Sequence, residues 1–573
     1  MSDSLIYDMS LGSEETEVPF LSKQLIYIND NNASKQYSTH EIIWDSLSIG
    51  SNGKYNSLRQ GYLAIPLVIS VTAATTAAPG TAIDFGALNS TDFLVCLKDS
   101  NLNLISSLMI EYNNTPLVTT QQNLNAYLIF KQHVSMSKDD VNNELIGYNI
   151  DEPTSWQYNN TASPAGVGIC NNVCGESYQP AAAGHNGKLF NEGMMKRSQI
   201  FVNERTAFGR SSIYTKDVLL EKNQNVIFDT GTEKTYHYTA ILRLRDIHSL
   251  FDNMPLVRGA NLKITLRINQ GYFEVSRGAA GQLNHDPTKS ILANGTCPIM
   301  VSANSVNITS CANAFGATAA IAVATGDMKY PSGSATVPFD TTLKCSVSVV
   351  SNIWGNGTSN QIHKLTNARL YLPSYVLQTE YEKQYLALGQ RTVKYIDTFY
   401  KAFENQPVQS DVQIQITSSC VNPKRLIIIP MLNKEVNGDK KNRPMASPFD
   451  TSPSTTSPYS MTNVQCFISG NPIYQTQQNY TFETFTNELN NFGLNSNENT
   501  GLSSGLITYK HFSNNYNYIV IDLSRKLPED SNTSVSIDFA FKITSLKALD
   551  LFCYVEQEKS ITINLLNGSL IKV

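Results

Sequence analysis

The chain has 573 residues, of which 41% are hydrophobic and 16% charged, and its formal net charge is −5. This length and apolar content are sufficient for two or more buried cores. Abundant Asn, Ser, Thr and Tyr favour β-sheets joined by polar turns over a helical protein. The negative charge supplies no basic field for phosphates, so the composition does not support direct nucleic-acid binding by the chain as a whole.

The first segment, residues 1–20, contains acidic residues and no basic one. It predicts a mobile acidic arm and argues against a secretory signal, which would carry basic residues before an apolar stretch. No window has the ~18 strongly apolar residues that a transmembrane helix requires. Nine cysteines in a chain without a signal peptide favour free thiols in a reducing compartment.

In the first half of the chain, period-two alternation and turn residues predict strands at 25–30, 40–47, 62–71, 92–98, 105–112, 236–247, 262–268, 344–350 and 367–377. A helix is predicted at about 121–132, with Leu124, Tyr127, Leu128 and Lys131 on the one face that packs across a sheet edge or end. The weakly periodic segments at about 138–232 and 271–342 predict long loop insertions.

A capping box formed by Thr379 and Glu382 predicts a short helix that Gly389 ends, and we place the domain boundary there. The second half is more compact. Its predicted strands are 392–400, 412–417, 425–432, 516–523, 534–543, 546–556 and 559–572. A helix containing Phe482, Phe485, Leu489 and Phe492 interrupts them, and a hairpin turn is predicted at Asn567-Gly568.

The two halves share an internal repeat. The phrase PLVTTQQN at 116–123 returns as PIYQTQQN at 472–479, and other anchors repeat in the same order. These anchors are Tyr27-Ile28-Asn29 with Tyr395-Ile396-Asp397, Ile65-Pro66-Leu67 with Ile429-Pro430-Met431, and Tyr236-x-Tyr238 with Tyr516-x-Tyr518. The offset between copies falls from 356 to 280, and the difference, 356 − 280 = 76 residues, predicts a large insertion in the first copy.

The predicted fold is therefore all-β, with two related β-domains in tandem, short helices, and long loop insertions in the first domain. The predicted divisions are an acidic arm at 1–20, a first domain at 21–378, a linker helix at 379–389 and a second domain at 390–573.

Two local patterns invite a chemical interpretation that their context opposes. Gly501-Leu502-Ser503-Ser504-Gly505 fits the G-x-S-x-G nucleophile elbow, but an Asn-rich loop precedes it and a strand-like segment, 506–510, follows it. We interpret it as a loop. Cys170 and Cys174 could share a metal, yet only His185 lies nearby, so we interpret them as two thiols in a loop.

Other polar clusters also have plainer interpretations. His285-Asp286 has no partner nucleophile. Asp139, Asp140 and Glu144 lack the spacing of an EF-hand and predict a solvated face. The segment 184–188 lacks the spacing of a phosphate loop, and the Asn-x-Ser/Thr triplets are expected by chance in a chain rich in Asn. We predict no catalytic, cofactor-binding or metal-binding residue.

Several longer strings resemble one family. They are NARLYLPSY (367–375), VNPKRLIIIP (421–430), SPFDTSPSTTSPY (447–459), IVIDLSRKLPED (519–530) and ALDLFCYVEQEKSITIN (548–564). With the repeat, they resemble the major capsid proteins of the virophage and Polinton-like virus group, a lineage related to adenovirus hexon. The resemblance is strongest from about 360 to 573 and fades in the two insertions.

The resemblance implies a double jelly roll that trimerises into a pseudo-hexagonal capsomer of an icosahedral shell, with loops forming outward towers. It also implies a protein without enzymatic activity or cofactor, located in the virion after assembly in a host cell, with neighbouring capsomers, penton and minor capsid proteins as partners. The alternative is a cytosolic β-sandwich carbohydrate-binding protein or glycosidase, suggested by the many Tyr and Asn residues. A glycosidase needs paired carboxylates, and the sequence offers no convincing pair.

Overall fold

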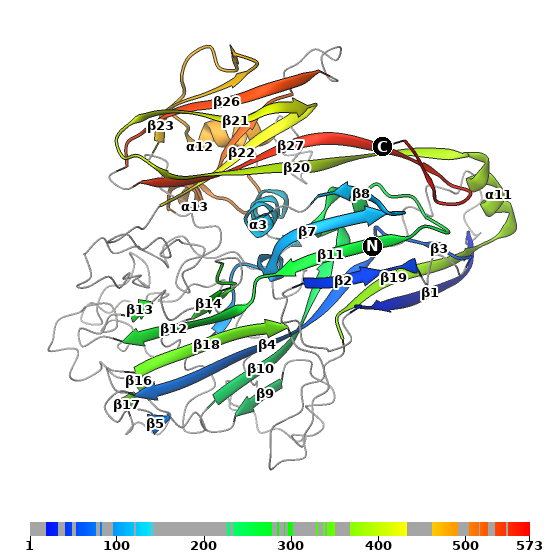
Figure 1. Ribbon diagram of the computed structural model, residues 1–573, viewed down its shortest axis with the longest axis horizontal. Coiled ribbons are helices and arrows are strands. Elements are labelled where there is room, and N and C mark those ends of the chain that lie inside the picture. Colours follow the sequence, from blue (N-terminus) through cyan, green and yellow to red (C-terminus); the bar gives the residue numbers. More distant parts are fainter. Residues whose placement is uncertain are drawn as a thin grey trace.

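Strands dominate the computed structural model of the chain (Figure 1). The residues that the structure describes are 19–31, 41–47, 53–75, 81–82, 95–119, 122–137, 139–140, 226–229, 233–277, 283–285, 291–292, 296–301, 328–329, 336–337, 341–349, 367–432, 461–490, 504–514, 516–524, 533–545 and 548–572. Within this part of the chain, no helix is both long and apolar enough to cross a membrane.

The second half of the chain forms a β-sandwich. Its strands are β20 (Gln390–Gln406), β21 (Asp411–Val421), β22 (Pro423–Leu432), β23 (Met461–Ile468), β24 (Asn471–Pro472), β25 (Ile519–Asp522), β26 (Ser534–Ile543) and β27 (Leu549–Asn564). One sheet has the order β20-β27-β22-β25, and the other has the order β21-β26-β23-β24. Counted along the chain, the strands pair as 1-8-3-6 and 2-7-4-5, which is the order of an eight-stranded jelly roll.

The first half repeats this order. Its eight corresponding strands are β1 (Phe20–Asn29), β2 (Glu41–Asp45), β4 (Tyr62–Thr75), β7 (Ile105–Tyr112), β8 (Thr115–Val118), β10 (Glu233–Arg243), β11 (Leu262–Ile268) and β19 (Arg369–Leu377). One sheet runs β1-β19-β4 with β10 also paired to β4, and the other runs β2-β11-β7-β8. The predicted fold class, two jelly rolls in tandem, is confirmed by this strand order.

The repeated anchors lie in equivalent strands. The two PxxxTQQN phrases begin in β8 and β24, and each leads into a helix, α3 (Leu124–Ser135) or α12 (Phe482–Asn490). The register of the Tyr-x-Tyr match differs between the copies. Ala240 pairs with Ile65, whereas Val520 pairs with Ile427. The displacement of two residues leaves each side chain on the same face of its sheet.

The first jelly roll is extended by further strands beside β4. β18 (Thr341–Val349) pairs with residues 67–75 of β4, and β12 (Gly271–Arg277) pairs with β18. The strand predicted at 344–350 is present as β18. The prediction of a loop over 271–342 is wrong at its start, because β4 runs beyond its predicted end, pairs with β18, and β18 in turn offers the edge on which β12 forms. Shorter strands within this insertion are β13 (Leu283–His285), β14 (Ile291–Leu292), β15 (Ile299–Val301), β16 (Met328–Lys329) and β17 (Thr336–Val337).

Much of the remaining inserted sequence lies outside the described residues. In the insertion at 138–232, the structure describes residues 139–140 and the strand β9 (Val226–Asp229), which pairs with β10. Residues 1–18 of the predicted acidic arm also lie outside. β5 (Thr81–Ala82) and β6 (Val95–Leu97) complete the described strands between β4 and β7.

The connecting helix, α11 (Thr379–Ala387), lies between β19 and β20. Its predicted capping box is wrong, because the N-cap residue is Gln378 and no side chain caps it. The Glu382 carboxylate instead accepts a hydrogen bond from Tyr55 Oη at 2.9 Å and pairs with Arg258 at 2.8 Å. Gly389 has a φ of +67°, as expected for a glycine that ends a helix.

The C-terminal end of the chain returns to the first jelly roll. β27 is one strand where two were predicted, and it is followed by β28 (Leu570–Lys572), which pairs with it. The predicted turn at Asn567-Gly568 is present, with a φ of +68° at Gly568. Asn113 Nδ2 donates to the Gly568 carbonyl at 2.9 Å, so this turn rests on the first jelly roll.

Candidate functional site at the junction of the jelly rolls

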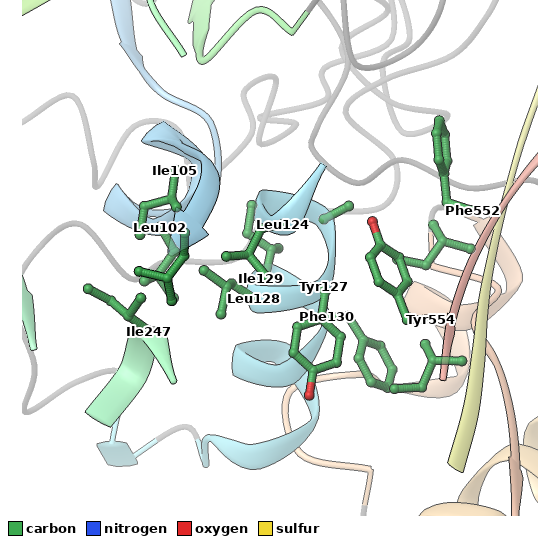
Figure 2. Packing of buried hydrophobic residues seen from close by; sticks show 14 of the residues in the cluster. Leu102, Ile105, Leu124, Tyr127, Leu128, Ile129, Phe130, Ile247, Phe552 and Tyr554 are labelled. Atoms are coloured by element: carbon green, nitrogen blue, oxygen red, sulfur yellow. The ribbon is translucent and has the colours of Figure 1, made fainter. Parts of the chain in front are cut away.

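The helix α3 lies between the two jelly rolls (Figure 1). Ten of its twelve residues are buried. Figure 2 shows Leu128 and Ile129 on the side of Leu102 and Ile247, and Tyr127 on the side of Tyr554. The helix predicted at about 121–132 is present at Leu124–Ser135, and its contacts extend beyond the predicted face, because the second jelly roll covers the side that the first leaves open. Apolar residues on more than one side are typical of a buried helix.

Asn123, the last residue of the first TQQN phrase, fixes the start of α3. Its backbone is left-handed, with a φ of +53°, a conformation that Asn tolerates better than most residues. Its side-chain amide donates to Tyr400 Oη at 2.6 Å, and its carbonyl accepts from Tyr554 Oη at 2.7 Å. Because both tyrosines belong to the second jelly roll, this residue joins the domains directly.

One turn further along, α3 reaches a buried ion pair. Tyr127 Oη donates to Glu556 Oε1 at 2.6 Å, and the other oxygen of Glu556 accepts from Arg425 Nε. Glu556 is fully buried. Burial, followed by the neighbouring carboxylate of Glu556, raises the pKa of Tyr127 well above its usual value, so the phenol stays a donor. A buried carboxylate needs all such partners, because leaving it unpaired is strongly destabilising.

A second polar group joins β20 to the short helices that follow β10, namely α8 (Leu244–Ile247) and η6 (Ser249–Phe251). His248 Nε2 lies 3.8 Å from Asp397 Oδ1, and Lys559 Nζ donates to Asp397 Oδ2 at 2.5 Å. Burial lowers the pKa of His248, which favours the neutral ring. Burial opposes ionisation of Asp397, but the neighbouring His248 and the hydrogen bond from Lys559 outweigh it and lower its pKa.

Ser249, His248 and Asp397 contain the residue types of a hydrolase triad, but their bonding excludes that role. In a triad the histidine bridges the serine and the carboxylate through its two nitrogens. Here His248 Nδ1 accepts from the Leu250 amide at 3.1 Å. Ser249 Oγ donates to the Ile396 carbonyl and accepts from the Ile396 amide, both at 2.9 Å. The three residues therefore hold the domains together and do not form a nucleophile.

The end of α3 meets the loop that contains the G-x-S-x-G pattern. The Leu506 amide donates to the His133 carbonyl at 2.8 Å, which caps the helix from the other domain. A Cβ on Gly505 would lie 2.5 Å from the Val134 carbonyl oxygen, so this glycine permits the close approach. The strand predicted at 506–510 is wrong, because Tyr509–Asn514 form the helix α13, whose start is capped by Thr508. Ser503 lies outside the described residues.

The other sequence candidates do not gather at this junction. Cys170, Cys174, His185, Asp286 and Glu144 lie outside the described residues, as does the segment 184–188. His285 ends β13. Asp140 accepts hydrogen bonds from the amide and hydroxyl of Ser137, and these bonds lower its pKa. Among the described residues, no group of three or more His, Cys, Asp or Glu side chains is placed to hold a metal ion.

Solved structures that are similar to this chain include capsid proteins of viruses. A chain of the Sputnik virophage structure has a TM-score of 0.49 and 11% identity, over 98% of this chain and 91% of that chain. The mavirus major capsid protein has a TM-score of 0.46 and 9% identity, over 98% of this chain and 92% of that chain. The Faustovirus major capsid protein has a TM-score of 0.43 and 10% identity, over 96% of this chain and 92% of that chain.

Virophages appear both among these structures and in the sequence resemblance. No protein-family model and no curated protein matches the chain. At TM-scores below 0.5 these likenesses carry no functional argument, and the jelly-roll assignment stands on the strand order of the chain itself.

Replacing Tyr127 by Phe tests the junction. The variant removes one hydrogen bond to the buried Glu556 carboxylate, so we expect the free energy of unfolding in urea to fall by about 1.5–3 kcal/mol. Tyr395→Phe is a matched control, because Tyr395 Oη reaches only a neutral carbonyl, that of Leu117, at 3.4 Å. It should cost less than about 1 kcal/mol. Equal losses in the two variants would contradict the assigned role of Tyr127.

The lowered pKa of His248 predicts a pH dependence of stability. The native ring stays neutral, so the unfolded chain binds the extra proton as the pH falls below about 6.5. Stability should therefore fall from pH 7 to pH 5, and His248→Asn should reduce that slope by up to about 1.4 kcal/mol per pH unit. Asp397 does not contribute to this slope. Because its native pKa is lowered, the stability that it provides is lost only when the pH falls to the ordinary pKa range of an aspartate and below. If the urea midpoint changes with pH to the same extent in the wild type and in His248→Asn, the prediction is contradicted.

Proposed function

We propose that the chain is a viral major capsid protein, a structural and non-enzymatic protein of which three copies form a pseudo-hexagonal tile of an icosahedral shell. The observation that carries the proposal is the duplication. One chain holds two jelly rolls of the same strand order, and α3 fixes one against the other. Three such chains supply six similar units, as a closed ring with a sixfold outline requires.

The proposal assigns the remaining roles of the chain. Its partners are two further copies of itself, neighbouring capsomers, and separate penton and minor proteins, and its location is the virion after assembly in the host cell. The net charge of −5 makes it a poor candidate for condensing a genome, so a separate basic component would do so.

The carbohydrate-binding alternative finds less support at the junction. A recess there is lined by Leu108, Val118, Leu124, Tyr127, Lys131, Ile247, His248, Ser249, Ile396 and Thr398. This lining contains no carboxylate, whereas glycoside hydrolysis ordinarily uses a pair of them. Its volume of about 330 Å³ includes open solvent, so the enclosed space is smaller than most ligand pockets.

The assembly state tests the proposed function. Light scattering on the purified chain after size-exclusion chromatography should give three times the chain mass of 63.3 kDa, and negative-stain images should show particles with a hexagonal outline. A stable monomer at micromolar concentration that turns over or binds a glycan would contradict it and favour the alternative.

A further inference from the structure

The first strand of the first jelly roll exposes a row of apolar side chains. Leu21, Leu25 and Tyr27 are 69%, 52% and 52% exposed. The spacing of Leu25 and Tyr27 places them on one face of β1, and Leu21 lies at the register shift near the start of the strand. We call these three residues the β1 face. The Tyr27 ring lies 6.1 Å from that of Tyr371, which stacks on Tyr62 at 4.9 Å. Aromatic rows of this kind are frequent in the centres of protein interfaces.

The repeat identifies the counterpart of this face in the second jelly roll. With the offset of 368, Leu25 and Tyr27 correspond to Val393 and Tyr395 of β20. Those two residues are only 1% and 3% exposed. Tyr395 lies against the first jelly roll, because its hydroxyl donates to the Leu117 carbonyl and its ring lies 5.9 Å from that of His248. The same strand positions are therefore covered in one copy and open in the other.

The element that covers β20 also has two copies. We call residues 115–135, which hold β8 and α3, the first corner, and residues 471–490, which hold β24 and α12, the second corner. The first corner contacts the second jelly roll through Leu117, Asn123 and Tyr127. With the offset of 356, Asn123 and Tyr127 correspond to Asn479 and Glu483.

The equivalent surface of the second corner is open. Asn479, Glu483 and Asn487 are all exposed. Glu483 and Asn487 are four residues apart and lie on one side of α12, and Asn479 lies just before the helix begins. Pro472 and the segment 475–477 are exposed beside them. The chain thus carries one docked corner and one open corner, together with one covered strand and one open strand.

We propose that the second corner of one copy docks on the β1 face of another copy, repeating between chains the contact that the first corner makes with β20 inside the chain. The proposal deepens the proposed function and rests on it. The two surfaces differ, so the contact is head-to-tail, and such a contact closes into a ring when the rotation permits. Three copies then alternate internal and external contacts around six jelly rolls.

Charge supports this partner. Glu483 lies on the second corner, whereas Lys23 and Arg369 border the β1 face, and the guanidinium of Arg369 lies 4.4 Å from the centre of the Tyr27 ring. Opposite charges across an interface favour the correct pairing. Among the strands that the structure describes, β1 is also an edge strand, paired with β19 alone. An open apolar edge is an aggregation hazard unless a specific partner covers it.

The double variant Leu25→Glu/Tyr27→Glu tests the β1 face. Because the variant places two carboxylates opposite Glu483, the trimer should dissociate, and light scattering should give the mass of a monomer. Both side chains are about half exposed within the chain, so the monomer should keep its thermal unfolding profile. Val408→Glu/Val421→Glu is the matched control: these valines are 47% and 46% exposed, lie in the second jelly roll outside both surfaces, and should leave the trimer intact.

Cross-linking tests the pairing itself. Tyr27→Cys combined with Pro472→Cys in one chain, treated with a short bis-maleimide, should give dimer and trimer bands under denaturing conditions. Tyr27→Cys combined with Val408→Cys should give no more cross-linked product than the wild type gives. A wild-type trimer that survives the Glu substitutions, or that yields no specific cross-link, would overturn this contact and leave the proposed function standing. A wild-type chain that remains monomeric would overturn both.

Discussion

A largely buried helix, α3, holds the two jelly rolls together. α3 belongs to the first jelly roll by sequence, but Tyr400, Tyr554, Glu556 and the loop at 505–506 of the second complete its surroundings. Separating the domains would expose its apolar residues and leave the carboxylate of Glu556 without one of its donors. The cost of that separation keeps the two domains in one orientation. A ring built from several chains depends on such a fixed orientation, because a flexible joint would not define the angle between its units.

Polar contacts around α3 determine where it sits, and apolar burial supplies most of the stability. Asn123 sets the start of the helix, Tyr127 and the Glu556–Arg425 pair set its rotation, and the Leu506 amide caps its end. These contacts also account for the difference between the copies. The residue that corresponds to Tyr127 is Glu483, which would bring a second carboxylate to a site like that of Glu556. The second corner therefore requires a different surface, and the β1 face with its bordering cations provides one.

The sequence predicts a strand best where one face of the strand is buried and the other is exposed to solvent. The strand 262–268 has its predicted bounds, because Leu262, Ile264, Leu266 and Ile268 alternate with polar residues. The order of the repeated anchors predicts the equivalence of the two strand sets.

Sequence reasoning missed Asn123, His248 and Asp397, whose roles depend on contacts across domains. A signal was present in the repeat, since Asp397 stands where the first copy has Asn29, and a charged residue at one of two equivalent positions marks an asymmetric contact. The capping box failed for a similar reason, because Tyr55 and Arg258 bind the Glu382 carboxylate.

The most direct test of the account is hydrogen exchange in α3 after a change in the other domain. Arg425→Met removes the ion-pair partner of Glu556 from β22, far from α3 in sequence. If the second jelly roll holds the helix, the peptide covering 124–135 should lose protection in the variant, while β11 at 262–268 should exchange as in the wild type. Unchanged protection of α3, with loss confined to the strands around β22, would contradict the claim that this helix joins the two jelly rolls.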